Sequence, residues 1–326
     1  MKKFNEIFID KTKYGEKIQT SEYEKQGKHI IVDQGQAEIA GYTNREEGLF
    51  NEVPVIIFGD HTRLIKYIDE PFFLGADGVK VLRSKEKNAN YKYLYYALKS
   101  AKIPNTGYNR HFKWLKDVEI NYPDSVKQEK IVDILDRVSD VIEKRKAELS
   151  YLDTLIKARF VEMFGDPIIN SKGLETKELN EVLVLKAGDF TAASDISVEP
   201  TEINIYPCYG GNGIRGYVAE YNQEGEYSLV GRQGALSGNV QYATGKFKNT
   251  EHALLVKPII RMNSIWLNQL LLNLDLKRYQ TGAAQPGLSV KNLQDIQIIM
   301  VPIDEQRQFA AFVNEIDKSK LQKFSA

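Results

Sequence analysis

Two short polar segments carry side chains of the kind that can pair with the edges of nucleic-acid bases. Arg232 and Gln233 follow the apolar run 227–230 and stand between Gly231 and Gly234. Arginine can donate two hydrogen bonds to guanine, and glutamine can pair with adenine. A second such segment comes earlier in the chain, where the apolar run 53–58 is followed by Gly59 and then by Asp60, His61, Thr62 and Arg63. An exposed polar hairpin is the alternative interpretation, but two copies of such a segment favour base reading.

A glycine-rich segment, Gly211–Gly216, fits the pattern GxGxxG. A dinucleotide-binding loop requires a strand before the glycines and a helix after them. Residues 217–221 alternate in polarity like a strand, so the sequence predicts a turn between strands instead. Glycines in such a turn can bring backbone N–H groups close to a DNA phosphate. The candidate residues here are Tyr209, Gly211, Asn212, Gly213 and Arg215.

Residues 99–116 form a third polar segment, with five Lys or Arg residues, no acidic residue and several aromatic residues. Basic side chains favour contacts with phosphate. In the alternative interpretation, the aromatic residues belong to the core and the lysines only cover a solvated face. We expect Trp114 and Leu115 in the core. The candidates for DNA contact are Tyr108, Asn109, Arg110 and Lys113, joined by Ser237, Gln285 and Lys291 from the later polar segments.

The chain repeats itself. Residues 106–123 resemble residues 281–302: each copy has Thr-Gly, then a Leu-x-Asp element, then a proline followed by a glutamine-containing helix start. Looser upstream matches relate 53–67 to 227–242 and 76–82 to 251–256, and helices are expected at 91–100 and 263–276. Chance similarity is the alternative, but the order of the blocks is kept. The pattern predicts a duplicated domain, each copy followed by a helix.

A long helix is expected over residues 124–163, which contain no glycine or proline. Its apolar residues recur at alternating steps of four and three, which is typical of helix-on-helix packing. They are Ile131, Leu135, Val138, Ile142, Leu149, Leu152, Ile156 and Met163, with Arg145 and Arg159 filling the two gaps in the series and Val141, Leu155 and Phe160 widening the stripe. Forty helical residues span about 60 Å, and Gly165–Pro167 should end the helix.

A second, shorter helix carrying Phe309, Val313 and Ile316 should pack antiparallel to the long one. Because it is about half as long, part of the first helix should face another chain, a missing extension or solvent. We expect its unmatched part, around Leu149, Leu152, Ile156 and Phe160, to be covered by a partner subunit or a second chain.

Composition sets further bounds. The chain has 326 residues, which suggests two domains, and its formal net charge is zero, which argues against a free-standing basic DNA clamp. One cysteine permits no internal disulfide, and four scattered histidines give no zinc-ligand spacing. Since neither a signal-peptide core nor a membrane span is found, we expect a cytoplasmic protein.

The chain resembles the specificity subunits of type I restriction-modification systems. The blocks that carry the resemblance are 149–167, 206–217, 229–240 and 285–293, together with 58–63 in the first half. It implies an α/β (α+β) fold with mostly antiparallel sheets and two pseudo-symmetric target recognition domains, at 1–123 and 166–302. Long coiled-coil-type helices, at 124–165 and 303–326, would separate them, the second helix being short.

The resemblance also implies a function and partners. Each recognition domain would read one half of a bipartite site in double-stranded DNA. Two methyltransferase (M) subunits and the endonuclease/motor (R) subunits would bind the chain, and S-adenosylmethionine, ATP and Mg would belong to those partners. The sequence shows neither an Asn/Asp-Pro-Pro-aromatic motif nor a GxxxxGK[ST] loop, as expected for a non-catalytic subunit. A protein-binding scaffold is the main alternative, and a nucleotide-dependent transferase ranks third.

Overall fold

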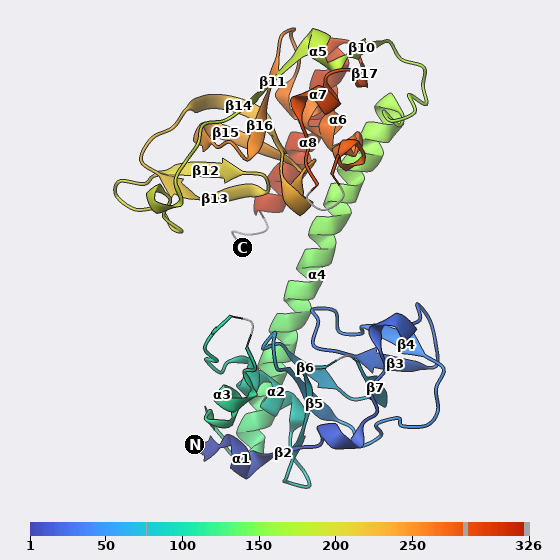
Figure 1. The fold of residues 1–326 in the computed structure, drawn as a ribbon, viewed down its shortest axis with the longest axis vertical. Helices are drawn as coiled ribbons and strands as arrows, with labels where there is room; N and C mark the ends of the chain where they lie inside the picture. The colour runs from blue at the N-terminus through green and yellow to red at the C-terminus, as the bar shows by residue number, and fades with distance from the viewer. Residues whose placement is uncertain (76, 108, 283–285, 323–326) are drawn as a thin grey trace. The chain divides into compact units, whose positions relative to one another are not determined.

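The computed structural model describes residues 1–75, 77–107, 109–282 and 286–322. The chain forms two compact units, Met1–Lys144 and Arg145–Ala326, and the division falls within the long helix α4, Ser125–Phe164 (Figure 1). We call them unit 1 and unit 2 and describe each by itself. The predicted domain boundaries at 123 and 166 stay predictions.

Unit 1 is built on a four-stranded antiparallel sheet with the order β2-β8-β5-β6. A smaller sheet, β4-β3-β7, contains one parallel pair, and β1 pairs with β9. The elements are β1 Lys2–Lys3, α1 Phe4–Ile7, β2 Phe8–Asp10, β3 His29–Val32, β4 Gly41–Thr43, β5 Val55–Gly59, β6 Ile65–Ile68, β7 Phe72–Leu74, β8 Val79–Ser84, α2 Tyr91–Lys99, α3 Phe112–Lys116 and β9 Glu119–Ile120, with short 3-10 turns η1 Thr12–Tyr14 and η2 Thr20–Glu22.

Unit 2 is built on a six-stranded sheet with the order β11-β16-β14-β15-β12-β13, in which only the β12–β15 pair is parallel. A separate pair joins β10 to β17. The elements are β10 Thr176–Glu178, α5 Leu179–Val182, β11 Leu183–Ala187, η3 Ala193–Asp195, β12 Tyr206–Gly210, β13 Gly213–Val218, β14 Gln223–Gly231, η4 Gly234–Leu236, β15 Val240–Asn249, β16 Ala253–Pro258, α6 Ser264–Asn273, η5 Leu276–Tyr279, α7 Val290–Leu293, β17 Gln297–Ile299 and α8 Ile303–Gln322.

The two units share one plan, which confirms the predicted duplication and the mostly antiparallel α/β (α+β) architecture. The sheet order β2-β8-β5-β6 of unit 1 recurs in unit 2 as β11-β16-β14-β15. Equivalent positions are buried alike: Leu115 and Leu293 are both inaccessible to solvent. The backbone also agrees, since Phe4 donates its N–H to Val118 in unit 1 and Leu179 donates to Ile296 in unit 2.

The predicted helices are confirmed. α2 and α6 lie within 91–100 and 263–276, and each begins at an asparagine, Asn90 or Asn263, whose side chain accepts hydrogen bonds from the first turn. α4 runs from Ser125 to Phe164. It ends where predicted, because Gly165 takes the left-handed conformation, with φ of 79°.

α8 packs antiparallel on the second half of α4, as predicted. Near its start, the Phe309 ring lies 5.4 Å from that of Phe160. Near its end, the carbonyl oxygen of Lys320 accepts a hydrogen bond of 2.9 Å from Nη2 of Arg145. The Lys320 ammonium group also pairs with Asp153 at 2.8 Å. The chain direction of α8 is therefore opposite to that of α4.

The expectation that Ile156 and Phe160 face a partner subunit is wrong. Both side chains are buried in the unit 2 core, at 4% and 0% exposure, among residues of α6 and α8. The antiparallel α8 covers one face of the C-terminal half of α4. Exposed apolar residues occur along the whole helix, and four of them, each about half exposed or more, stand three or four residues apart in its first half: Ile134, Val138, Val141 and Ile142. We call these four residues the α4 stripe.

Candidate nucleic-acid interface

The turn after β14 in unit 2 is tied by its backbone to two other segments. Arg232 donates its N–H to the carbonyl of His252 at 3.0 Å, and its own carbonyl accepts from Leu288 at 2.8 Å. The turn closes on itself, since Gly238 donates to the carbonyl of Gly231 at 2.9 Å. This junction brings together the β14–β15 turn, the β15–β16 turn and the segment before α7.

The turn after β5 in unit 1 has the same junction. Asp60 donates its N–H to Gly78 at 2.7 Å, and its carbonyl accepts from His111 at 2.7 Å. Arg63 donates to Gly59 at 2.7 Å, as Gly238 donates to Gly231. Arg63 even takes the left-handed conformation of Gly238, with φ of 62° against 83°. The two segments matched in the sequence are thus equivalent turns.

Asp60 is an interior residue of the unit 1 junction. Its side chain is only 4% exposed, and Oδ1 accepts the N–H of Phe112 at 2.7 Å. The imidazole of His111, fully buried, lies with Nδ1 3.0 Å from the Asp60 carbonyl. The carboxylate therefore orients the start of α3, and it offers little surface to a ligand.

The next three candidates form the outer part of this turn. The N–H of His61 donates to Oε1 of Gln34 at 3.0 Å, and the hydroxyl of Thr62 donates to the carbonyl of Gln34 at 2.7 Å. Arg63 reaches the carbonyl of Ile103 at 3.3 Å through Nη1. Thr62 is exposed, whereas His61 and Arg63 are half-buried.

The polar segment 106–116 lies beside this turn through its contact with Asp60. Asn109, Arg110 and Lys113 are exposed, as expected for groups that could meet DNA. The Lys113 ammonium group lies 4.9 Å from the centre of the Trp114 ring. Leu115 is buried as predicted, but Trp114 is only half-buried. Tyr108 lies outside the described residues.

Arg232 is half-buried rather than free in solvent. Its Nη1 donates to the carbonyl of Glu251 at 3.2 Å. Its Nε is buried and has no hydrogen-bond partner among the residues that the structure describes. Part of the guanidinium group thus braces the β15–β16 turn, which the sequence pattern did not indicate.

Gln233 is exposed, and its side chain contacts His252, which the sequence analysis did not identify as a site residue. Its Oε1 lies 3.1 Å from Nδ1 of His252, and Nε2 of His252 lies 3.2 Å from Oε1 of Glu251. A signal was available, because His252 falls in the segment 251–256 that the repeat matches to 76–82, next to the strand-end turn.

The glycine-rich segment is a turn between two strands, as predicted, because β13 begins directly at Gly213, whose φ is 94°. No helix follows, so the dinucleotide interpretation is excluded. The segment lies against the turn after β14: a Cβ on Gly231 would stand 2.6 Å from the carbonyl oxygen of Gly211. Only glycine permits that approach. Oδ1 of Asn212 accepts a hydrogen bond of 2.8 Å from Asn239.

The other candidates of unit 2 differ in exposure. Arg215 and Lys291 are exposed. Tyr209 is half-buried with its ring 5.4 Å from Phe247, and burial raises the pKa of its hydroxyl. Ser237 is fully buried, and its hydroxyl donates to the carbonyl of Gly234 at 2.8 Å, so it shapes the turn. Gln285 lies outside the described residues.

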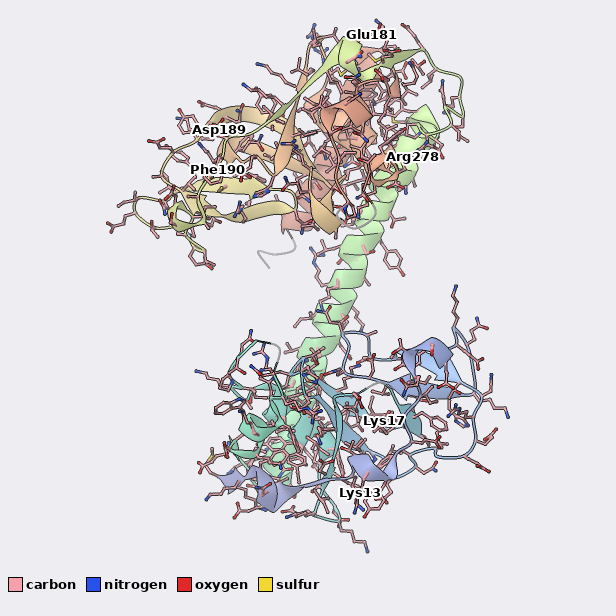
Figure 2. All side chains as sticks on the ribbon, in the orientation of Figure 1. Lys13, Lys17, Glu181, Asp189, Phe190 and Arg278 are labelled. Atoms are coloured by element: carbon pink, nitrogen blue, oxygen red, sulfur yellow. The ribbon has the colours of Figure 1, made fainter. Side chains whose placement is uncertain are left out.

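Two basic residues that sequence reasoning passed over lie beside this turn. A Cβ on Gly238 would stand 2.7 Å from the backbone nitrogen of Lys277, so η5 packs directly on the turn. Lys277 and Arg278 are exposed on η5, and Figure 2 labels Arg278 there. Their charges could reach phosphate while the turn meets bases.

Within the described residues, no group of three or more His, Cys, Asp or Glu side chains could hold a metal ion. None of the described helices combines the length and the apolar character needed to cross a bilayer.

Comparison with known proteins gives one consistent result. The model of the type I restriction modification DNA specificity domain matches residues 1–151 and 171–323. The type I restriction enzyme EcoprrI specificity subunit of Escherichia coli is 38% identical over 194 residues, which are 58% of this chain and 48% of that protein. The EcoR124I/EcoR124II specificity subunit of Escherichia coli is 27% identical over 167 residues, 47% of this chain and 40% of that protein.

The matched part thus spans about half or less of the length of these relatives. Among solved structures, the S subunit of the type I restriction-modification system from M. genitalium superposes with a TM-score of 0.60. That alignment covers 98% of this chain and 90% of the other at 20% sequence identity, and it shows a shared fold.

Proposed function

This chain belongs to the type I restriction modification DNA specificity domain family, and from that premise we propose that it binds duplex DNA and reads one half of a bipartite site with each unit. The observation that carries the proposal is the junction that occurs twice. In each unit, the residue after the strand-end glycine is tied through its N–H and its carbonyl to the same two neighbouring segments. The scaffold is constant, but the exposed side chains that it carries differ, Thr62 in unit 1 and Gln233 in unit 2.

Such an arrangement would allow the two units to recognise different base sequences. A rigid turn at a strand end can place a few side chains in a groove, and base identity then depends on those side chains alone. Exposed cations beside the turn, Lys113 in unit 1 and Lys277 in unit 2, would hold phosphates and fix the register. The zero net charge of the chain is compatible with this, because partners can add positive surface.

We further propose that the chain acts in the cytoplasm within a complex. Its partners would be two methyltransferase (M) subunits, which act on adenine, and endonuclease/motor (R) subunits, with S-adenosylmethionine, ATP and Mg bound by those partners. The α4 stripe supports a protein contact, since four apolar side chains one or two turns apart on one helix are costly to leave in water.

The rival function, a scaffold that binds only proteins, is separated from this one by duplex binding. The chain would be co-expressed with its methyltransferase subunit, and binding of the complex to fragments of host DNA would be measured by fluorescence anisotropy. We expect a subset of fragments to bind far more tightly than the rest at 150 mM salt. Uniform weak binding that disappears as salt rises would favour the scaffold.

A further inference from the structure

We propose that Gln233 and His252 form one base-reading pair, in which the imidazole fixes the side-chain amide of Gln233 so that its NH2 group faces the DNA. The inference rests on the proposed function and deepens it for unit 2. It names His252 as a positioning residue for specificity and Gln233 as the residue that touches the base.

The hydrogen bonds of the ring carry the argument. Nδ1 of His252 faces Oε1 of Gln233 at 3.1 Å, and Nε2 faces Oε1 of Glu251 at 3.2 Å. Oε1 of Gln233 is an acceptor, and Nδ1 of His252 satisfies it by donating a hydrogen. The amide oxygen of Gln233 is then engaged, and within the described part of the chain its NH2 group has no hydrogen-bond partner, so it can face a ligand.

The pair is held on one rigid piece of backbone. Arg232, adjacent to Gln233, donates its N–H to the carbonyl of His252 at 3.0 Å, and its Nη1 donates to the carbonyl of Glu251 at 3.2 Å. On the other side, Gln233 forms a β-bridge with Gly287. The amide and the imidazole thus keep their relative position when the turn meets a groove, and little side-chain freedom remains to be lost on binding.

An outward NH2 group selects among bases. In the major groove, guanine presents two acceptors, N7 and O6, whereas cytosine presents the N4 donor. A fixed NH2 donor therefore favours guanine and rejects cytosine at one position of the second half-site. Within the described residues of unit 1 this pair has no counterpart, because Gly78, which has no side chain, stands where unit 2 has His252.

The test is a selection of duplexes with a randomised second half-site by the complex of this chain with its methyltransferase subunit. Gln233→Ala and His252→Ala should relax the same single position by about 5- to 150-fold, the range of one good base contact. The double variant should be no worse than either single variant. Gln233→Glu, which turns the donor into an acceptor, should shift the preference at that position toward cytosine.

Two further variants serve as controls. His252→Asn places an amide NH2 near the position of Nδ1 and should keep most of the wild-type preference, while showing that the turn folds. His29→Ala removes the histidine that pairs with Glu46 in unit 1 and should change nothing in the second half-site.

The proposal is overturned if Gln233→Ala and His252→Ala relax different positions, if their effects add, or if His252→Ala has no effect. A wild-type complex that selects no motif at all would instead contradict the proposed function.

Discussion

Replacing Phe160 with alanine should remove much of the stability of unit 2. The Phe160 side chain is fully buried, and its ring contacts Phe164 at 5.1 Å and Phe309 at 5.4 Å, both edge-on. Deleting a buried phenylalanine side chain costs about 3–5 kcal/mol through lost burial and the remaining cavity. The free energy of unfolding of a domain is only about 5–15 kcal/mol, so the substitution should remove a large part of it.

The two tryptophans make the assay specific, because Trp114 belongs to unit 1 and Trp266 to unit 2. In a Trp114→Phe background, fluorescence reports only Trp266, whose ring lies 6.2 Å from Phe164 in the same core. With a urea m-value of about 2 kcal/mol per molar, Phe160→Ala should lower the unfolding midpoint by about 2 M.

The matched control is Tyr151→Ala, at a position of α4 that is 74% exposed. It should change the free energy of unfolding by no more than about 0.5 kcal/mol. If Phe160→Ala behaved like this control, then α8 would not cover α4 in solution, and the end of α4 would again be a candidate partner surface.

Three more predictions concern function. Val138→Asp with Ile142→Asp should abolish co-purification of the methyltransferase subunit without moving the Trp266 midpoint, since both side chains are about half exposed; intact assembly would refute a role for the α4 stripe. Arg232→Ala should weaken specific binding by about 1–3 kcal/mol and relax one base pair of the second half-site. A uniform loss on all sequences, with the salt slope lower by about one, would make Arg232 a phosphate contact. Exchanging residues 1–123 for those of another family member should change only the first half of the methylated motif, and a change in both halves would contradict two separate readers.

The sequence predicted the features that depend on local patterns. A stretch without glycine or proline predicted α4, and the ordered repeat predicted two equivalent sheets. The first pattern lies within one stretch of chain, and the second needs only the comparison of one stretch with another.

What the sequence did not predict depends on tertiary contacts. Which end of α4 is covered depends on where unit 2 returns the chain to start α8, and helix length alone does not show this. The pairing of Gln233 with His252 joins residues 19 positions apart on separate turns. The brace from Arg232 to Glu251 likewise appears only when the sheet is assembled.

The central claim, that this chain selects the DNA sequence to be modified, is tested most directly by sequencing the methylated adenines of the host genome with and without its gene. The account predicts a two-part motif, interrupted by a spacer of fixed length, that is methylated in the presence of the gene and unmethylated after its deletion. Reintroducing the gene with Gln233→Ala should restore the motif with one relaxed position in its second half. An unchanged methylation pattern after deletion, in cells that express both the chain and its methyltransferase subunit, would contradict the account.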